Sequence, residues 1–293
     1  MEISASWTGT SLRDFHTVID WRDTMNYAAA LDDDNPCYFN DERPEGVLAP
    51  PLYAVALTWP VSEKIWEFIE AENFPVELLA TQVHYTEHLH FYRPLAPGVA
   101  LTIRGNIAAI LPHRAGTHVV IRFDGLDEAG ERIFTEHIGA MLRGVRCIDG
   151  ERGREDLPAV PRCDGISGEP CWEETVHVHA LFPFLYDGCS RIFFPIHTSR
   201  KFARQVGLPG IIVQGTATLA LAVREIIRRE AGGDPRRLRS LSCRFTGMVL
   251  PGTDIIVRLL ERKRTQGATE LFFAVLDQDC RQAISGGYAS LTD

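Results

Sequence analysis

HFYRPLAPGVALTIRG (residues 90–105) and RFTGMVLPGTDIIVRL (residues 244–259) are two copies of one pattern, and this duplication decides the fold. The copies align without a gap at an offset of 154, the distance from Phe91 to Phe245, and Pro97-Gly98 then falls on Pro251-Gly252. Each copy has the alternating apolar positions of a strand, a Pro-Gly turn and a second such strand. The chain is therefore expected to consist of two similar halves.

Each half is expected to combine one long helix with an antiparallel sheet, an α+β arrangement. The helical segments are LYAVALTWPVSEKIWEFIEA (52–71), in which Pro60 should bend or break the helix, and TATLALAVREIIRREAG (216–232). The short polar segments DEAG (127–130) and DQDC (277–280) predict hairpin turns between later strands. The apolar start of each helix can be buried only if a curved sheet wraps around it.

A linker is expected between the halves. The segment is rich in glycine, proline and charged residues and shows little periodicity. We therefore divide the chain into a first half at 1–144, a linker at 145–170 and a second half at 171–293.

Composition excludes several classes of protein. The chain has 293 residues, of which 45% are hydrophobic and 24% charged, which is typical of a soluble globular protein. The net charge of −9 argues against a nucleic-acid partner. No run of apolar residues is long enough to cross a membrane. Seven scattered cysteines without a CxxC pair indicate reduced thiols in the cytoplasm.

The segment FPIHTSRKFARQVGLPGIIVQGTATLALA (194–222) contains the strongest candidate site. His197 titrates near neutral pH and can serve as a general base or acid. Gly215 follows eighteen positions later, immediately before the apolar helix. The free N–H groups at a helix start can stabilise a developing oxyanion. One segment thus supplies both halves of an enolate-forming site.

These residues resemble a known family. YAAALDDDNPCYFND with GVLAPPLYAVAL, and FPIHTSRKFARQVGLPGIIVQGTATLALA with RFTGMVLPG, are similar to the two halves of a MaoC-type double hotdog hydratase. The resemblance implies a tandem hotdog in which two antiparallel sheets each wrap around a long central helix. It also implies reversible addition of water to a trans-2-enoyl thioester, giving a 3-hydroxyacyl thioester, as in fatty acid metabolism. His197 and Gly215 match the family's histidine and glycine at their spacing.

The sequence departs from the family signature D-x-N-P-x-H in both halves. In the second half, Ile192 stands at the aspartate position and Phe194 at the asparagine position. In the first half the aspartate, asparagine and proline are present as Asp33, Asn35 and Pro36, but Tyr38 stands at the histidine position.

Pro50 and Pro51 of the first half stand where the second half has Gln214 and Gly215, and proline has no N–H to donate. We expect the first half to cradle the substrate, with Asp33 and Tyr38 as its candidate binding residues. The Asp33–Pro36 segment is expected to form a structural turn whose side chains bond nearby backbone N–H groups.

The missing carboxylate is expected to come from elsewhere in the second half. Asp187 is the nearest candidate, if a longer loop carries it inward; the alternative is that Asp187-Gly188 is only a turn. Gln214 can orient water or the thioester, because an amide both donates and accepts hydrogen bonds. Arg191 can add charge to the same loop. Phe194 and its neighbouring aromatics indicate a bulky acyl group or, alternatively, core packing.

Other candidate features carry less weight. His84, His88 and His90 should alternate between the faces of one strand, which does not suit a metal site, and no cofactor is expected. The leading hypothesis is a hydratase or dehydratase of an acyl-CoA, with an acyl-carrier thioester as the other substrate form and self-association open. The alternatives are a catalytically altered acyl-thioester binding protein or partner subunit, and a hotdog thioesterase.

Overall fold

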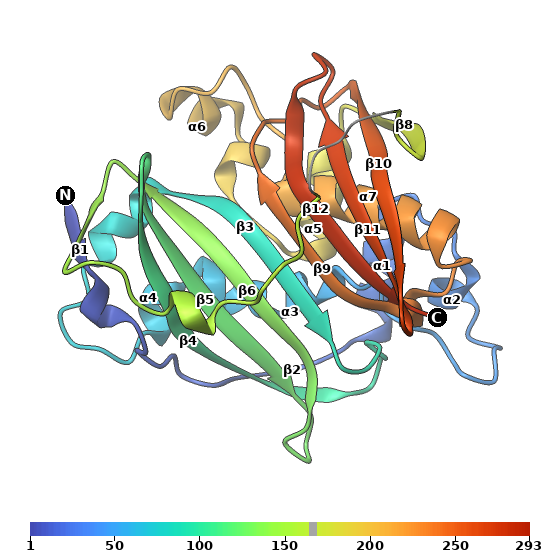
Figure 1. The fold of residues 1–293 in the computed structure, drawn as a ribbon, viewed down its shortest axis with the longest axis horizontal. Coiled ribbons are helices and arrows are strands. Elements are labelled where there is room, and N and C mark those ends of the chain that lie inside the picture. The colour runs from blue at the N-terminus through green and yellow to red at the C-terminus, as the bar shows by residue number, and fades with distance from the viewer. Residues whose placement is uncertain (164–168) are drawn as a thin grey trace.

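One ten-stranded antiparallel sheet organises the protein (Figure 1). The computed structural model describes residues 1–163 and 169–293. The strand order is β2-β4-β5-β6-β3-β9-β12-β11-β10-β8, so the first five positions belong to the first half and the last five to the second. The strands span β2 Phe15–Val18, β3 Gln82–Phe91, β4 Ala100–His113, β5 Gly116–Leu126, β6 Arg132–Arg143, β8 Trp172–Val178, β9 Leu238–Phe245, β10 Thr253–Thr265, β11 Ala268–Leu276 and β12 Gln282–Thr292.

The two halves meet at strands β3 and β9 and are related by an approximate two-fold axis. Along this pair His88 lies directly opposite Ser242, its own counterpart at the offset of 154. The flanking pairs obey the same symmetry, since Thr86 lies opposite Arg244 and His90 opposite Ser240. The predicted tandem hotdog is confirmed, and its two sheets join edge to edge into one.

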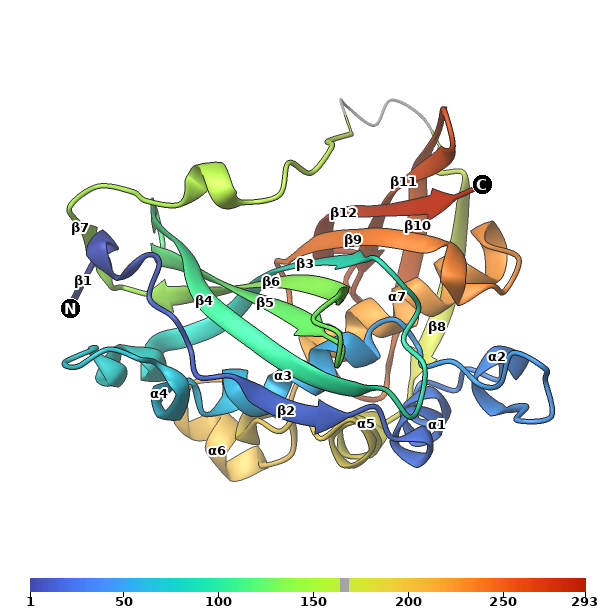
Figure 2. The same ribbon diagram turned by 90° about the horizontal axis from the view of Figure 1, so that it is seen from below.

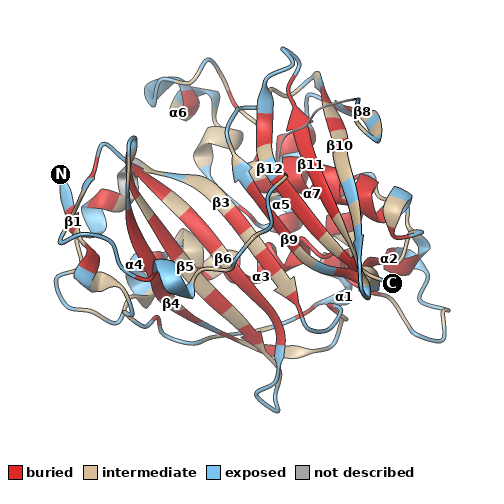
Figure 3. Cartoon of the chain, viewed as in Figure 1, coloured by how far each residue is buried: buried red, intermediate tan, exposed pale blue. Residues whose placement is uncertain are grey.

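The long helices α3 (Tyr53–Glu63) and α7 (Gly215–Glu230) lie on the same side of the sheet (Figure 2). Helix α7 is buried almost from end to end, whereas α3 continues through Pro60 and stops at Glu63, shorter than the predicted 52–71. Buried residues line both the strands and α7 (Figure 3), and one apolar cluster extends through both halves.

Shorter helices complete each half. The α-helices are α1 Trp21–Ala30, α2 Pro36–Phe39, α4 Ile65–Phe68, α5 Phe182–Ser190 and α6 Arg200–Gln205. The 3-10 helices are η1 Ala5–Trp7, η2 Val76–Thr81, η3 Arg154–Asp156, η4 Pro195–His197 and η5 Pro235–Arg237.

The duplication extends to individual backbone hydrogen bonds. The segment before each long helix forms one backbone hydrogen bond with the loop that follows β3 or β9. In the first half Ala49 N–H donates to Leu95 O at 2.9 Å. In the second half Val213 N–H donates to Val249 O at 2.9 Å. Both polar hairpin turns are also present, at 127–130 between β5 and β6 and at 277–280 between β11 and β12. The two halves therefore present equivalent surroundings at the start of each long helix.

The segment between the halves is partly built into the first one. Strand β7 (Arg146–Ile148) pairs in parallel with β1 (Glu2–Ser4), and Arg152 and Ile110 exchange backbone hydrogen bonds of 3.0 and 3.1 Å. The segment then crosses the face of the sheet opposite to α3 and α7 (Figure 2). Residues 164–168 of the expected linker lie outside the described residues. Within the described part of the chain, no helix is long and apolar enough to span a membrane.

Candidate active site

A hydrogen bond holds His197 beside the start of helix α7. It ends the 3-10 helix η4, and its Nδ1 lies 2.9 Å from the carbonyl oxygen of Ile212, three residues before Gly215. A carbonyl can only accept, so Nδ1 carries the proton and Nε2 is the basic nitrogen. Burial lowers the pKa of His197 to about 4, although the hydrogen bond to Ile212 opposes that shift. The imidazole is therefore neutral at pH 7 and ready to accept a proton.

The start of α7 presents backbone N–H groups beside this imidazole. Gly215 is the first helical residue, and no capping hydrogen bond from the side chain of Gln214 is present. Gln214 is 1% exposed and donates from Nε2 to Pro183 O at 3.0 Å. Its Oε1 is buried and has no hydrogen-bond partner within the described residues. The first turn of α7 can therefore bind an oxyanion through its unpaired N–H groups.

Gly215 also packs closely against an aromatic ring. A Cβ atom at this position would lie 3.0 Å from Phe245 Cδ1, closer than side chains ordinarily approach. Phe245 is the last residue of β9 and occupies the place that Phe91 has in the first half. The ring therefore forms a wall of the site next to the helix start.

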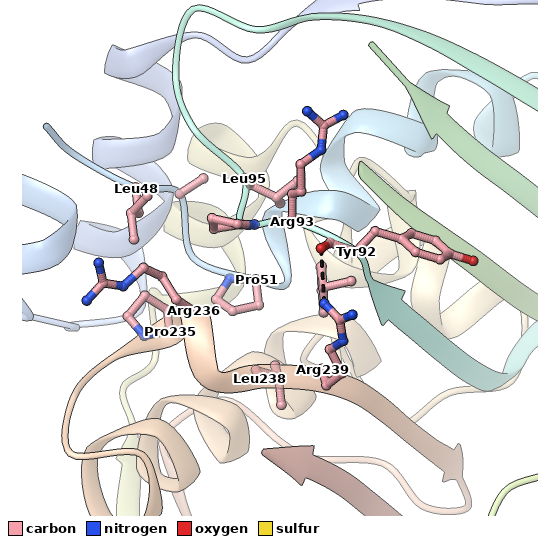
Figure 4. Close-up of a pocket in the computed structure, with 12 residues that line it drawn as sticks. Leu48, Pro51, Tyr92, Arg93, Leu95, Pro235, Arg236, Leu238 and Arg239 are labelled. Atoms are coloured by element: carbon pink, nitrogen blue, oxygen red, sulfur yellow. Dashed lines mark hydrogen bonds between the residues drawn. The ribbon is translucent and has the colours of Figure 1, made fainter. Parts of the chain in front are cut away.

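The same place in the first half lacks both the histidine and the glycine, having Tyr38 and Pro51 instead. Tyr38 is fully buried, and its hydroxyl has no hydrogen-bond partner among residues 1–163 and 169–293. Pro51 lies at the start of the α3 segment and lines a pocket with Phe91 and Leu95 (Figure 4). This pocket lies between the halves, and across it Arg239 donates to Tyr92 O at 3.0 Å.

The Asp33–Pro36 segment forms a structural turn. Asp33 accepts from Asn35 N–H at 3.3 Å, and Asn35 caps α2 by accepting from Cys37 N–H at 3.0 Å. Asn35 also donates to Gly233 O of the second half at 2.7 Å. Burial raises the pKa of Asp33 to about 6. The expected structural turn is thus confirmed, and substrate binding by Asp33 stays a prediction.

Asp187 lies within helix α5 and not on the longer loop expected for it. Its carbonyl accepts from Arg191 N–H at 2.9 Å, which closes the helix at a left-handed Arg191. Asp187 Oδ1 is buried and unpartnered within the described chain, and burial together with nearby Glu63 raises its pKa. The carboxyl is thus available for a new partner, and the structure gives no contact between it and His197.

The remaining predicted residues divide between the site and the interface of the halves. The ring of Phe194 lies 6.5 Å from the ring of His197, so the structure brings these two together. Arg191 instead forms a salt bridge of 2.9 Å with Asp23 of the first half. Ile192, at the family's aspartate position, is buried at 3% exposure and supplies no polar group.

A chain of buried hydroxyls, not predicted from the sequence, joins the two halves near the helix start. Tyr27 and Tyr186 are both fully buried, with their hydroxyl oxygens 3.1 Å apart. Tyr186 also donates to Thr216, the second residue of α7, at 3.2 Å. The signal was present, since Tyr27 and Tyr186 stand at the same distance before Pro36 and Pro195 in their halves.

Comparison with known protein families agrees with this geometry. Residues 184–277 match the model of the MaoC like domain, and residues 6–136 match the FAS1-like dehydratase domain region. The second half is therefore similar to MaoC-like domains, and the first half is similar to a dehydratase region. The two matches fall on the two halves in the order that the duplication predicts.

Similar curated proteins include hydratases and dehydratases of acyl thioesters. The peroxisomal enoyl-CoA hydratase 2 of Arabidopsis thaliana is 25% identical over 186 residues, covering 60% of this chain and 59% of that protein. The 3-hydroxyacyl-thioester dehydratase Y of Mycobacterium tuberculosis is 28% identical over 182 residues, or 59% of each chain. The fatty acid synthase subunit beta of Aspergillus oryzae is 38% identical over 109 residues, 36% of this chain but 5% of that protein. The matched part thus spans at most about three-fifths of these relatives.

Solved structures share the whole fold. A MaoC-like dehydratase from Phytophthora capsici superposes with a TM-score of 0.85 at 21% identity, covering 98% of this chain and 97% of that one. A Mycobacterium tuberculosis protein described as a double hotdog fold has a TM-score of 0.60 at 14% identity and covers 97% of each chain. At these identities the likeness shows the fold alone.

Proposed function

We propose that this protein adds water to the double bond of a trans-2-enoyl-CoA, or removes it from the corresponding 3-hydroxyacyl-CoA. The proposal rests on the hydrogen bond between His197 Nδ1 and Ile212 O, which holds a neutral imidazole beside the uncapped start of α7. Catalysed hydration needs a base for water and donors for the thioester oxygen, and this segment provides both. The family match and the similar hydratases point the same way.

The chemistry follows from the two elements. His197 accepts a proton from water at Nε2 as the water oxygen bonds to the β-carbon. The electron pair of the double bond moves toward the carbonyl and leaves negative charge on the thioester oxygen. The N–H of Gly215 stabilises that enolate, a contribution of typically about 3 kcal/mol per donor. A proton then returns to the α-carbon, so the enzyme ends in its starting state.

Two buried polar groups are candidates to assist His197. Gln214 has a free, buried Oε1 next to Gly215 and can hold water or the thioester in place. Asp187 has a free, buried Oδ1, and its raised pKa favours a protonated carboxyl that can donate as well as accept. We assign orientation of the substrate to Gln214 and keep Asp187 as the candidate carboxylate.

The first half and its border with the second are assigned to substrate binding. Phe194 lies beside His197 and suits contact with the acyl group. Asp33 and Tyr38 flank Asn35, which donates to Gly233 O of the second half, and Arg191 bonds Asp23 of the first half, so we assign all three to substrate binding at the junction of the halves. CoA is favoured over an acyl-carrier protein because the net charge of −9 opposes an acidic carrier. We place the protein in the cytoplasm from its scattered cysteines and propose self-association of the double hotdog.

A second candidate function is binding of acyl thioesters without turnover. The observation that favours it is Ile192, a buried apolar residue where the family has its aspartate. Incubation with crotonyl-CoA and with a longer enoyl-CoA, followed by chromatography of the thioesters, separates the two functions. Formation of 3-hydroxyacyl-CoA by the wild type supports the hydratase. Tight binding of both thioesters without product supports the binding protein.

The same assay on Asp187→Asn assigns the carboxylate. Loss of turnover with intact folding makes Asp187 the group that replaces the missing aspartate. Unchanged turnover removes Asp187 from the mechanism and leaves the assignment of His197 and Gly215 intact.

A further inference from the structure

Two glutamates are completely buried between the sheet and helix α3. Glu87 of β3 and Glu136 of β6 are each 0% exposed, and their four carboxyl oxygens have no hydrogen-bond partner within the described residues. Burial raises the pKa of both residues, and for Glu136 the neighbouring Glu87 raises it further. Buried carboxyls are costly, so an apolar core would not contain them without a use for them.

An imidazole lies beside Glu87. His84 Nε2 lies 3.2 Å from Glu87 Oε2 and 3.1 Å from the carbonyl oxygen of Thr86. The carbonyl can only accept, so Nε2 carries the proton and Nδ1 has a free lone pair. Within residues 1–163 and 169–293 no hydrogen-bond partner of Nδ1 is found. Since 20% of the His84 side chain is exposed, a small molecule can reach it.

This pair borders the proposed active site. The His84 ring lies 4.5 Å from the ring of Phe245, the residue that closes against Gly215. Glu87 is also close enough to Tyr186 to raise its pKa, and the Tyr186 hydroxyl bonds to Thr216 in the first turn of α7. His84 and Glu87 therefore approach the start of α7 from the sheet, whereas His197 approaches it from the preceding loop.

The internal symmetry supplies a control for this arrangement. At the offset of 154, His84 corresponds to Leu238 and Glu87 to Leu241. Leu238 lines the first-half pocket together with Pro51 and Phe91 (Figure 4). Beside the helix start with Pro51, which has no N–H to stabilise an oxyanion, the equivalent residues are therefore packed leucines. Of these two symmetry-related places, the polar pair occurs at the one beside the helix start that has Gly215.

We propose that His84, beside Glu87, is a second residue of the site at Gly215 that binds the attacking water, and that it takes the place of the aspartate missing at Ile192. This assignment rests on the proposed hydratase function. The water donates one hydrogen bond to Nδ1 of His84 and the other to Nε2 of His197. His197 takes the proton while the water oxygen bonds to the β-carbon and the double-bond electrons move to the thioester. The proton then returns from His197 to the α-carbon, so one water is added and both imidazoles end neutral.

Glu87 is in this scheme a positioning residue. Its Oε2 lies 3.2 Å from Nε2 of His84, and the Nε2–H itself donates to Thr86 O. These two contacts place Nδ1 on the free side of the ring, where it can face the substrate. Burial and the neighbouring Glu87 raise the pKa of Glu136, which opposes a second negative charge in the core.

The test compares crotonyl-CoA hydration by wild type, His84→Gln, Glu87→Gln and the control His88→Gln. His88 lies on the same strand but opposite Ser242 at the two-fold axis, away from Phe245. We expect His84→Gln to lower kcat about 100-fold or more and the control to stay within about threefold of wild type. Glu87→Gln should lower kcat at least about tenfold and shift the pH–rate profile, with KM little changed.

Rescue separates a chemical role from a structural one. Added imidazole should restore part of the activity of His84→Gly, and a folded variant that imidazole does not rescue would overturn the assignment. A wild type that hydrates crotonyl-CoA, with His84→Gln fully active and His197→Ala inactive, would overturn this inference alone. A wild type inactive on all enoyl thioesters would overturn the proposed function and this inference with it.

Discussion

Replacing Gly215 by proline removes one N–H from the site while leaving a conformation that the chain already accepts. Gly215 is the first residue of α7, the helix position where proline is most readily accommodated. The preceding Gln214 has φ −58° and ψ 135°, within the extended region that a residue before proline requires. The first half shows the same solution, since Pro51 precedes α3. The fold should therefore survive Gly215→Pro.

The expected effect on catalysis is large. Loss of one oxyanion donor costs about 3–4 kcal/mol in the transition state, or about 10²–10³ in kcat. Any new side chain also meets Phe245, because a Cβ would lie 3.0 Å from its ring. Gly215→Ala has the same Cβ but keeps the N–H, so the ratio of the two variants isolates the hydrogen bond.

The assay is the initial rate of crotonyl-CoA hydration at saturating substrate, with thermal unfolding measured on the same samples. We expect Gly215→Ala to lose at most about tenfold and Gly215→Pro about a further 100-fold. Equal kcat values for the two variants, both folded, would refute the assignment of the Gly215 N–H to the oxyanion.

Three further predictions concern the buried groups. The pKa values of Glu87 and Glu136 are raised in the folded protein, so the folded protein retains protons that the unfolded chain loses as pH rises. The free energy of unfolding should therefore fall with rising pH, by about 1.4 kcal/mol per pH unit for each retained proton. Glu136→Gln should flatten that slope at pH values above 4.5, the ordinary glutamate pKa, in urea titrations; equal slopes for wild type and variant would contradict the prediction. Tyr38→Phe should leave stability unchanged or raise it by up to about 1 kcal/mol, because the buried hydroxyl has no partner within the described residues; a loss of that size would reveal one. Burial lowers the pKa of His197 to about 4, so kcat/KM should be level from about pH 6 to pH 8 and fall only below about pH 5, where the imidazole gains a proton. A midpoint near pH 6.5 would show that the pKa of His197 is not lowered in the free enzyme.

The duplication was the most predictable part of the fold. Alternating apolar positions and Pro-Gly turns are local signals, and they located both strand pairs and both polar hairpins. The buried helix α7 was predicted to within two residues at its C-terminal end, because its apolar stretch ends in the basic residues that suit a helix C-terminus. The joining of β3 to β9 was not predictable in this way, since edge pairing depends on how two folded halves meet.

Other differences have identifiable physical causes. The Asp187-Gly188 dipeptide is typical of a turn, yet it lies in α5, whose Tyr186 is anchored on Tyr27 and Thr216. The helix expected to reach residue 71 stops at Glu63, since Lys64 adopts φ −119° and ψ 39°. Local composition also predicted a free linker, whereas strand pairing with β1 holds its first part on the sheet.

The candidate site was predictable in part. His197 and Gly215 follow from spacing along one segment, so the sequence was sufficient to pair them. His84 and Glu87 stand on another strand, and their relation to Gly215 depends on Phe245 across the β3–β9 junction. Only the register of that junction shows which histidine of the strand faces the helix start.

The central claim is that His197, beside Gly215, hydrates an enoyl thioester, and the initial rate of crotonyl-CoA hydration tests it most directly. The decrease in enoyl-thioester absorbance would be followed for wild type, His197→Ala and Tyr38→Phe, the last altering the equivalent position of the first half. We predict turnover by wild type and Tyr38→Phe, and a loss of about 100-fold or more in folded His197→Ala. Equal rates for wild type and His197→Ala, or no turnover by any of the three, would contradict the account.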